Sequence, residues 1–126
     1  MTSILVIDDE APIRHSLELL LELKGFDVRT AADGHEGLRA IEEARPDLVI
    51  TDVIMPGSGI DTLASIKADQ PDLKVIVMSG GGRIEGRDVL QVASEVGADT
   101  CMRKPFAAEE LFAELTRLLP EHPVFA

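Results

Sequence analysis

Cysteine is almost absent from this chain, and basic residues are scarce. Cys101 is the single cysteine of the 126 residues, so no disulfide can form within the chain, and a reducing cytoplasm fits. The 12 lysines and arginines are outnumbered by 23 aspartates and glutamates, which gives a net charge of −11. Nucleic acids and anionic membrane surfaces both attract basic patches, so we expect neither as a direct partner.

Long apolar runs are missing as well. No run approaches the ~20 residues of a membrane span. Thr2 and Ser3 lead straight into a short apolar run, without a basic segment before it or a small-residue cleavage site after it, so no signal peptide is expected. The length, with 45% hydrophobic and 28% charged residues, predicts one globular domain over 1–126 whose residues 120–126 form a frayed C-terminal tail.

Strand and helix patterns alternate five times along the chain. Short apolar runs rich in β-branched residues predict strands at 4–7, 26–30, 48–50, 75–78 and 100–102. Apolar residues at helical spacing predict helices at 12–24, 34–44, 60–68, 89–96 and through 111–118. This alternation is typical of an α/β fold in which buried parallel strands carry helices on both faces.

Polar side chains stand where the predicted strands end. Asp8 and Asp9 follow the first strand, Asp52 the third, Ser79 the fourth, and Lys104 lies just beyond the fifth. In an open parallel sheet, ligands bind at the carboxyl ends of the strands. We therefore expect these side chains to meet at one edge of the sheet.

The chemistry of these residues indicates phosphoryl transfer. Carboxylates ~4 Å apart at an effective dielectric of ~20 repel each other by about 4 kcal/mol per pair, so a cation is needed. Mg²⁺, for which Mn²⁺ can substitute, prefers oxygen ligands, and no histidine or cysteine is present here to favour zinc. With Lys104 and Mg²⁺, the three acids sum to zero charge. Asp52 stands alone at a central strand and is the predicted nucleophile toward phosphorus, while Asp8 and Asp9 hold metal.

With these residues in this order, the chain resembles the receiver domains of bacterial two-component response regulators, the CheY-like family. The resemblance runs from Ile4 to Leu119 and rests on Asp8-Asp9, on Asp52 followed by Met55-Pro56, on Ser79 and on Lys104-Pro105-Phe106. It implies a single receiver domain over 1–126 with a doubly wound, flavodoxin-like five-stranded parallel sheet in the order 2-1-3-4-5. It also implies a cytoplasmic protein that is a monomer or a weak dimer.

The resemblance further implies how the site works. Asp52 would accept a phosphoryl group from a sensor histidine kinase or a histidine phosphotransfer protein. Lys104 would bridge Asp52 and the phosphoryl oxygens, and the hydroxyl of Ser79 would swing toward the phosphoryl group. A downstream protein effector would then read the change. The only catalysis expected is Mg²⁺-dependent self-phosphorylation and self-dephosphorylation.

The metal ligands also follow from the resemblance. Asp9 would bind Mg²⁺ directly, Asp8 would help through water, and Asp52 together with the backbone carbonyl of Ile54 would complete the protein ligands.

Four departures from the family pattern concern the output of such a switch. Cys101 occupies the place, three residues before the lysine, where the family usually has tyrosine or phenylalanine. Gly59 arrives one position early after the acceptor, and the segment from Gly80 to helix 89–96 is about three residues longer than usual. Ile54 and Gly81 stand where, in this family, side chains tune the attack of water on the phosphate.

Three functions stay open at this level. The first is a stand-alone phosphoacceptor switch, and the second is a receiver cut from a longer transcription factor or hybrid kinase. The third is a phosphatase of the haloacid dehalogenase type, whose motif places two acids one residue apart, whereas Asp8 and Asp9 are adjacent.

Each site residue also has a plainer, structural interpretation. Asp8-Asp9-Glu10 is also the pattern of a helix N-cap, Asp52 and Ser79 of turn residues, and Lys104 of a solvated surface lysine. Cys101 is expected to be a small apolar strand residue. The three histidines are expected at the surface: His15, His35 and His122.

Overall fold

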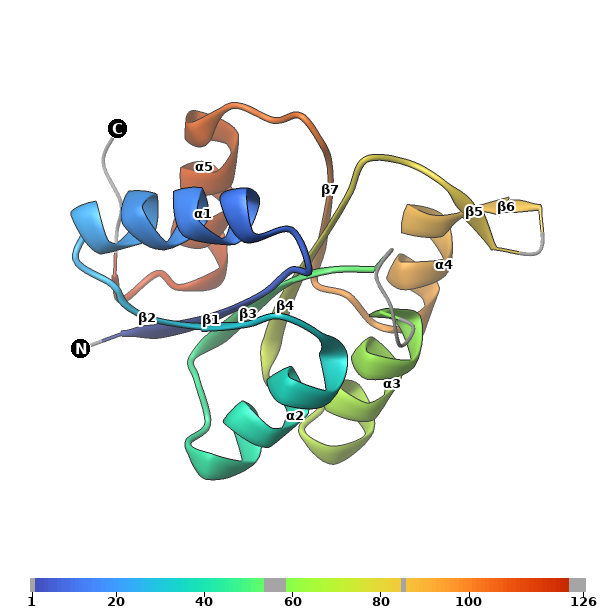
Figure 1. Cartoon of the computed structure of the whole chain (residues 1–126), viewed down its shortest axis with the longest axis horizontal. Coiled ribbons are helices and arrows are strands. Elements are labelled where there is room, and N and C mark those ends of the chain that lie inside the picture. Colours follow the sequence, from blue (N-terminus) through green and yellow to red (C-terminus); the bar gives the residue numbers. More distant parts are fainter. Residues whose placement is uncertain (1, 54–58, 85, 123–126) are drawn as a thin grey trace.

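A parallel five-stranded sheet forms the centre of the molecule, with helices on both of its faces (Figure 1). The computed structural model describes residues 2–53, 59–84 and 86–122. The strands lie in the order β2-β1-β3-β4-β7, and β7 is the fifth strand of this sheet along the chain, so the predicted order is confirmed. Their bounds are Ser3–Ile7 for β1, Asp27–Ala31 for β2, Leu48–Asp52 for β3, Lys74–Ser79 for β4 and Thr100–Arg103 for β7.

The helices divide between the two faces of this sheet. α1 (Ala11–Leu23) and α5 (Ala108–Leu118) cover one face, and α2 (Gly34–Glu43), α3 (Gly59–Asp69) and α4 (Val89–Val96) cover the other (Figure 1). Each face has its own hydrophobic core. No helix within the described residues is long and apolar enough to cross a membrane.

The first strand shows why the apolar runs predicted buried strands. Ile4 and Val6 belong to the core beneath α1 and α5, whereas Leu5 and Ile7 belong to the opposite core. Successive side chains of a strand point to opposite faces, so a strand covered on both sides needs apolar residues at every position.

A small hairpin outside the sheet was not expected from the sequence. β5 (Arg83–Ile84) and β6 (Arg87–Asp88) pair antiparallel in the segment that was predicted to be a glycine loop leading to the fourth helix. The glycines are nevertheless required, because Gly81, Gly82 and Gly86 have φ values of +120°, +122° and +78°, which side chains strongly disfavour.

The start of α3 lies tight against the end of β3. A Cβ on Gly59 would lie 2.3 Å from Cα of Val53 and 2.7 Å from the carbonyl oxygen of Asp52. Only glycine allows this approach, so Gly59 fixes where α3 begins. The turn predicted between Met55 and Gly59 lies mostly outside the described residues, as does the carbonyl of Ile54 that was predicted to bind metal.

The last described residue differs from its expected surface position. His122 is half-buried, stacks on Phe26 with ring centroids 4.1 Å apart, and places Nδ1 2.9 Å from Oγ1 of Thr2. His15 and His35 are exposed, as expected.

Candidate functional site

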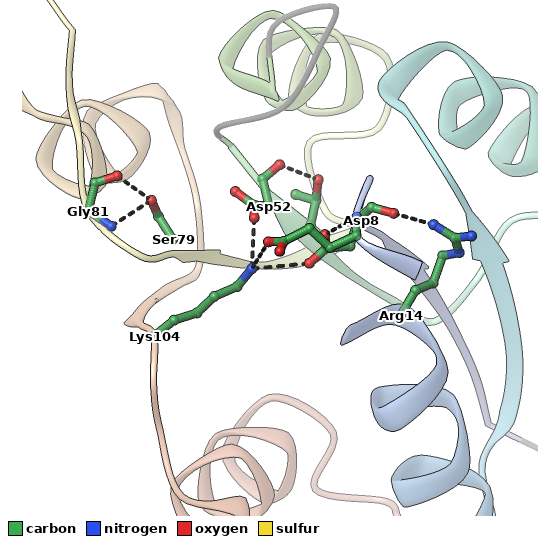
Figure 2. A network of polar contacts seen from close by, with 8 residues as sticks. Asp8, Arg14, Asp52, Ser79, Gly81 and Lys104 are labelled. Atoms are coloured by element: carbon green, nitrogen blue, oxygen red, sulfur yellow. Dashed lines mark hydrogen bonds and ion pairs between the residues drawn. The ribbon is translucent and has the colours of Figure 1, made fainter. Parts of the chain in front are cut away.

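Four strand ends bring the predicted site residues to one edge of the sheet. Asp8 follows β1, Asp52 ends β3, Ser79 ends β4 and Lys104 follows β7. Figure 2 shows the Lys104 side chain reaching across to both aspartates. Its Nζ lies 2.8 Å from Oδ2 of Asp52 and 3.1 Å from Oδ2 of Asp8. The convergence of these three residues, from positions 96 apart in the sequence, matches the prediction.

The two aspartates that contact Lys104 are buried. Asp8 is 0% exposed and Asp52 is 4% exposed. Burial alone pulls the pKa of Lys104 down, but its hydrogen bonds to Asp52 and Asp8 and their charges outweigh burial, so the pKa lies above its usual 10.5. Lys104 is therefore a permanent cation at neutral pH, and the interpretation as a solvated surface lysine does not hold.

Four carboxylates form one cluster, and three of them lie within 4 Å of the Lys104 ammonium. Asp8, Asp9, Glu10 and Asp52 each offer an oxygen, and these oxygens all lie within 4.8 Å of one another. An all-oxygen set with two buried members suits a hard divalent cation such as Mg²⁺. Lys104 supplies a single positive charge against four carboxylates, so the cluster keeps a net negative charge that attracts a further cation.

Glu10 is the member of this cluster that sequence reasoning missed as a site residue. It was considered only as part of a helix N-cap, and it does occupy the N-cap position of α1, but its side chain makes no capping hydrogen bond. Its Oε1 instead lies 3.9 Å from Nζ of Lys104. Its adjacency to Asp8 and Asp9 was the signal that pointed to the site.

Hydrogen bonds to the loop after β1 hold Asp8 in place. Oδ1 of Asp8 accepts a hydrogen bond from the backbone N–H of Glu10 at 2.9 Å. Arg14 Nη1 donates to the carbonyl oxygen of Asp8 at 2.7 Å, as Figure 2 shows. On the neighbouring strand, Oγ1 of Thr51 donates to the carbonyl oxygen of Asp52 at 2.9 Å. The acidic side chains are thus attached to a backbone that is itself constrained.

Ser79 lies at the same edge, but its hydroxyl is bonded within its own loop. Oγ donates to the carbonyl oxygen of Gly81 at 2.9 Å and accepts from the N–H of Gly81 at 3.1 Å (Figure 2). The side chain is fully buried, and its carbonyl oxygen accepts from the N–H of Lys104 at 2.8 Å. In this state Ser79 is the turn residue of the plainer interpretation, one strand away from Asp52.

Cys101 behaves as the small strand residue that was expected. It is half-buried on β7, and its thiol lies 3.5 Å from the carbonyl oxygen of Leu90 in α4. Burial raises the pKa of this thiol above its usual 9.0, and the charge of Asp88 adds to the effect. Neutral thiols are poor nucleophiles, so a reactive role is disfavoured.

Comparison with known proteins identifies the family. Residues 4–116 match the sequence model described as the response regulator receiver domain. The chain belongs to this family. The receiver domain is also 38% identical to the transcriptional regulatory protein PrrA of Mycobacterium tuberculosis over 117 residues, which are 92% of this chain and 49% of PrrA. It therefore spans about half the length of the curated relatives that it matches.

Solved structures agree with this assignment. The receiver domain superposes on a response regulator receiver domain protein from Clostridium thermocellum with a TM-score of 0.86, at 37% identity and 96% coverage of both chains. It also resembles the response regulator TrrA from Thermotoga maritima, solved in complex with Mg²⁺–BeF, with a TM-score of 0.83 at 33% identity, covering 94% of this chain and 100% of TrrA. The protein is thus a signalling domain of the two-component class.

Proposed function

We propose that this receiver domain accepts a phosphoryl group on Asp52 in a Mg²⁺-dependent reaction and thereby changes which protein it binds. One observation carries the proposal: the buried Asp52 contacts Lys104 at 2.8 Å and belongs to a cluster of four carboxylates whose oxygens lie within 4.8 Å of one another. A nucleophile, a fixed cation and ligands for a second cation are the parts that phosphoryl transfer needs.

The reaction forms one bond and breaks one. A carboxylate oxygen of Asp52 attacks the phosphorus of a phosphohistidine on a sensor kinase or phosphotransfer protein. The oxygen–phosphorus bond forms while the phosphorus–nitrogen bond breaks, and its electron pair stays on the imidazole nitrogen of the donor. Mg²⁺, when bound, offsets negative charge on the transferred group.

The protein's own residues would position the metal and the phosphoryl group and neutralise their charge. Asp9 would hold Mg²⁺ directly and Asp8 would help through water, with Asp52 and the backbone carbonyl of Ile54, which lies outside the described residues, as the other protein ligands. The ammonium of Lys104, already within 2.8 Å of Asp52, donates to the phosphoryl oxygens and stabilises their charge in the transition state. Ser79 provides a hydroxyl one strand away, and this hydroxyl must leave Gly81 before it can reach the phosphoryl group.

The downstream partner is a protein effector, which is either separate or part of the same polypeptide. The second arrangement is favoured by one observation: the relatives named as transcriptional regulators are about twice as long as this chain. In that case the receiver domain regulates an effector domain covalently joined to it.

Labelling with a small phosphodonor tests the proposal. Acetyl phosphate and Mg²⁺ should add one phosphoryl group per chain, measured by intact mass, and Asp52→Asn should abolish the addition. Asp72→Asn should label like the wild type, because Asp72 is an exposed carboxylate that precedes β4, at the end of the sheet opposite Asp52. Undiminished labelling of Asp52→Asn means that the nucleophile is wrongly assigned. Release of many equivalents of phosphate from a generic phosphate ester indicates a phosphatase instead.

A further inference from the structure

The face of β7 that carries Cys101 also carries an arginine. Side chains two residues apart on a strand point to the same face, so Arg103 lies on the same side of β7 as Cys101, toward α4. Its Nη2 reaches Oδ2 of Asp88 at 2.6 Å. The long side chain of Arg103 therefore bridges β7 and the residue that caps α4.

Asp88 joins this arginine to the start of α4. It is the N-cap residue of α4, and its Oδ1 accepts from the backbone N–H of Leu90 at 2.9 Å while Oδ2 binds Arg103. The hydrogen bond from Leu90 and then the contact with Arg103 lower the pKa of Asp88, so the carboxylate stays charged at neutral pH. The charged contact between Asp88 and Arg103 therefore ties the first turn of α4 to β7, beside the weaker contact of the Cys101 thiol with the carbonyl oxygen of Leu90.

The second terminal nitrogen of the Arg103 guanidinium lies beside the loop that holds Ser79. A Cβ built on Gly81 would lie 3.6 Å from Nη1 of Arg103, so the guanidinium packs next to this glycine. Gly81 is the residue whose N–H and carbonyl both bond to the Ser79 hydroxyl. Ser79 and Arg103 are also paired across β4 and β7. A continuous set of contacts thus runs from Ser79 through Gly81 and Arg103 to Asp88.

We propose that the Arg103–Asp88 ion pair is the output latch of this receiver domain, closed while Ser79 is bonded to Gly81 and opened by phosphorylation. The proposal rests on the proposed function, because a phosphoryl group on Asp52 supplies the bias. When the Ser79 hydroxyl turns to the phosphoryl oxygens, Gly81 loses the bonds that fix its backbone beside Arg103. Arg103 then leaves Asp88, and the first turn of α4 loosens.

The strength of the latch fits this role. The side chains of Arg103 and Asp88 are 53% and 40% exposed, and ion pairs this exposed contribute little to global stability. Opening it therefore leaves the fold intact, while a modest difference in contacts between the two states of Ser79 is enough to shift the balance. Because both side chains reach the surface, opening also changes the charge pattern that a partner protein meets.

Hydrogen exchange at the Leu90 amide measures the state of the latch, because this N–H is bonded to Asp88. In the wild type, beryllofluoride with Mg²⁺ should speed this exchange. In Arg103→Gln the exchange of the unmodified protein should already be about two- to fivefold faster, the range expected when a half-exposed ion pair is lost, and beryllofluoride should add little. Asp88→Asn, which keeps a good N-cap residue but removes the charge, should also reduce the response.

Arg87→Gln is the matched control. Arg87 is next to Asp88 in β6, but it pairs with Glu95 rather than with Asp88. It should respond to beryllofluoride like the wild type, and all variants should melt cooperatively and accept one phosphoryl group from acetyl phosphate. If Arg103→Gln labels normally and its Leu90 amide still responds like that of the wild type, the latch is refuted while the proposed function stands. If the wild type is not labelled at all, the proposed function fails, and the latch fails with it.

Discussion

Substituting Asp52 with asparagine should stabilise the metal-free protein, although it removes a residue that binds Lys104. Carboxylate oxygens 4.8 Å apart repel by about 3.5 kcal/mol at an effective dielectric of ~20. Asp8 is buried and acts at about this strength, whereas Asp9 and Glu10 are exposed and screened to roughly half of it. Asp52 therefore experiences a repulsion of about 7 kcal/mol.

One attraction opposes this repulsion. With Nζ of Lys104 2.8 Å away, the same dielectric gives about 6 kcal/mol. An asparagine oxygen can still accept a hydrogen bond from Lys104, and the neutral amide avoids the free-energy cost of burying a charge. We expect Asp52→Asn to raise the free energy of unfolding by about 1–3 kcal/mol without metal, which for a domain of this size is roughly 3–4 °C of Tm per kcal/mol.

Thermal melting in EDTA and across a Mg²⁺ titration provides the measurement. If Mg²⁺ binds only the folded state, as proposed, it should stabilise the wild type by about 2.7 kcal/mol at 100 times Kd. The Asp52→Asn variant lacks one proposed ligand, so Mg²⁺ should stabilise it less than the wild type. The difference in Tm between the two proteins should therefore shrink as the Mg²⁺ concentration rises. Asp72→Asn, a change in an exposed pair with Arg45, should alter neither series. A variant that melts below the wild type in EDTA would refute the reasoning, because attraction to Lys104 would then exceed the repulsion.

Three further predictions concern single groups. Asp9→Ala should weaken Mg²⁺ binding in calorimetric titration more than Asp8→Ala, because a direct ligand contributes more than one acting through water; equal affinities would contradict these roles. The pKa of Asp88 lies below its usual 3.8 because of a backbone N–H at the start of α4 and then because of Arg103. The charged form of Asp88 therefore stabilises the folded protein above pH 3.8, and this stabilisation is lost as the pH falls through the pKa that Asp88 has in the folded state. Arg103→Gln should raise this pKa in carboxyl NMR titrations, and an unmoved value would show that the ion pair does not form in solution. The thiol of Cys101, whose pKa burial raises above 9.0, should react with iodoacetamide at pH 8 more slowly in the folded protein than in urea; equal rates would mean that the site is open.

Strands and the acidic site were predictable because two simple rules decide them. A strand buried on both faces must be apolar at every position, so Ile4–Ile7 and Val75–Met78 stand out without any periodicity. Parallel strands all end at one edge, so the residues after them had to converge. Neither rule depends on distances between side chains.

The features that were missed depend on such distances. The two-residue strands β5 and β6 are too short to show alternation, and a glycine-rich stretch gives no sign of pairing. The Arg103–Asp88 contact joins residues 15 positions apart, and nothing in either residue's neighbours indicates it. Likewise, nothing in the sequence near His122 indicates that its ring stacks on Phe26. Ser79 lies at the predicted edge of the sheet, but its bonds to Gly81 could only be seen in three dimensions.

The stacking of His122 on Phe26 fixes the place of the last described residue relative to the acidic cluster. Phe26 and Thr2, which both contact His122, precede β2 and β1, so this contact lies at the amino ends of the strands. The acidic cluster lies at the carboxyl ends, about 16 Å away for strands of five residues. His122 therefore lies at the end of the sheet opposite Asp52. An effector domain joined near His122 would have to reach past a helical face, such as that of α4, to contact the carboxyl ends of the strands, and the length of the tether would limit how often the two meet.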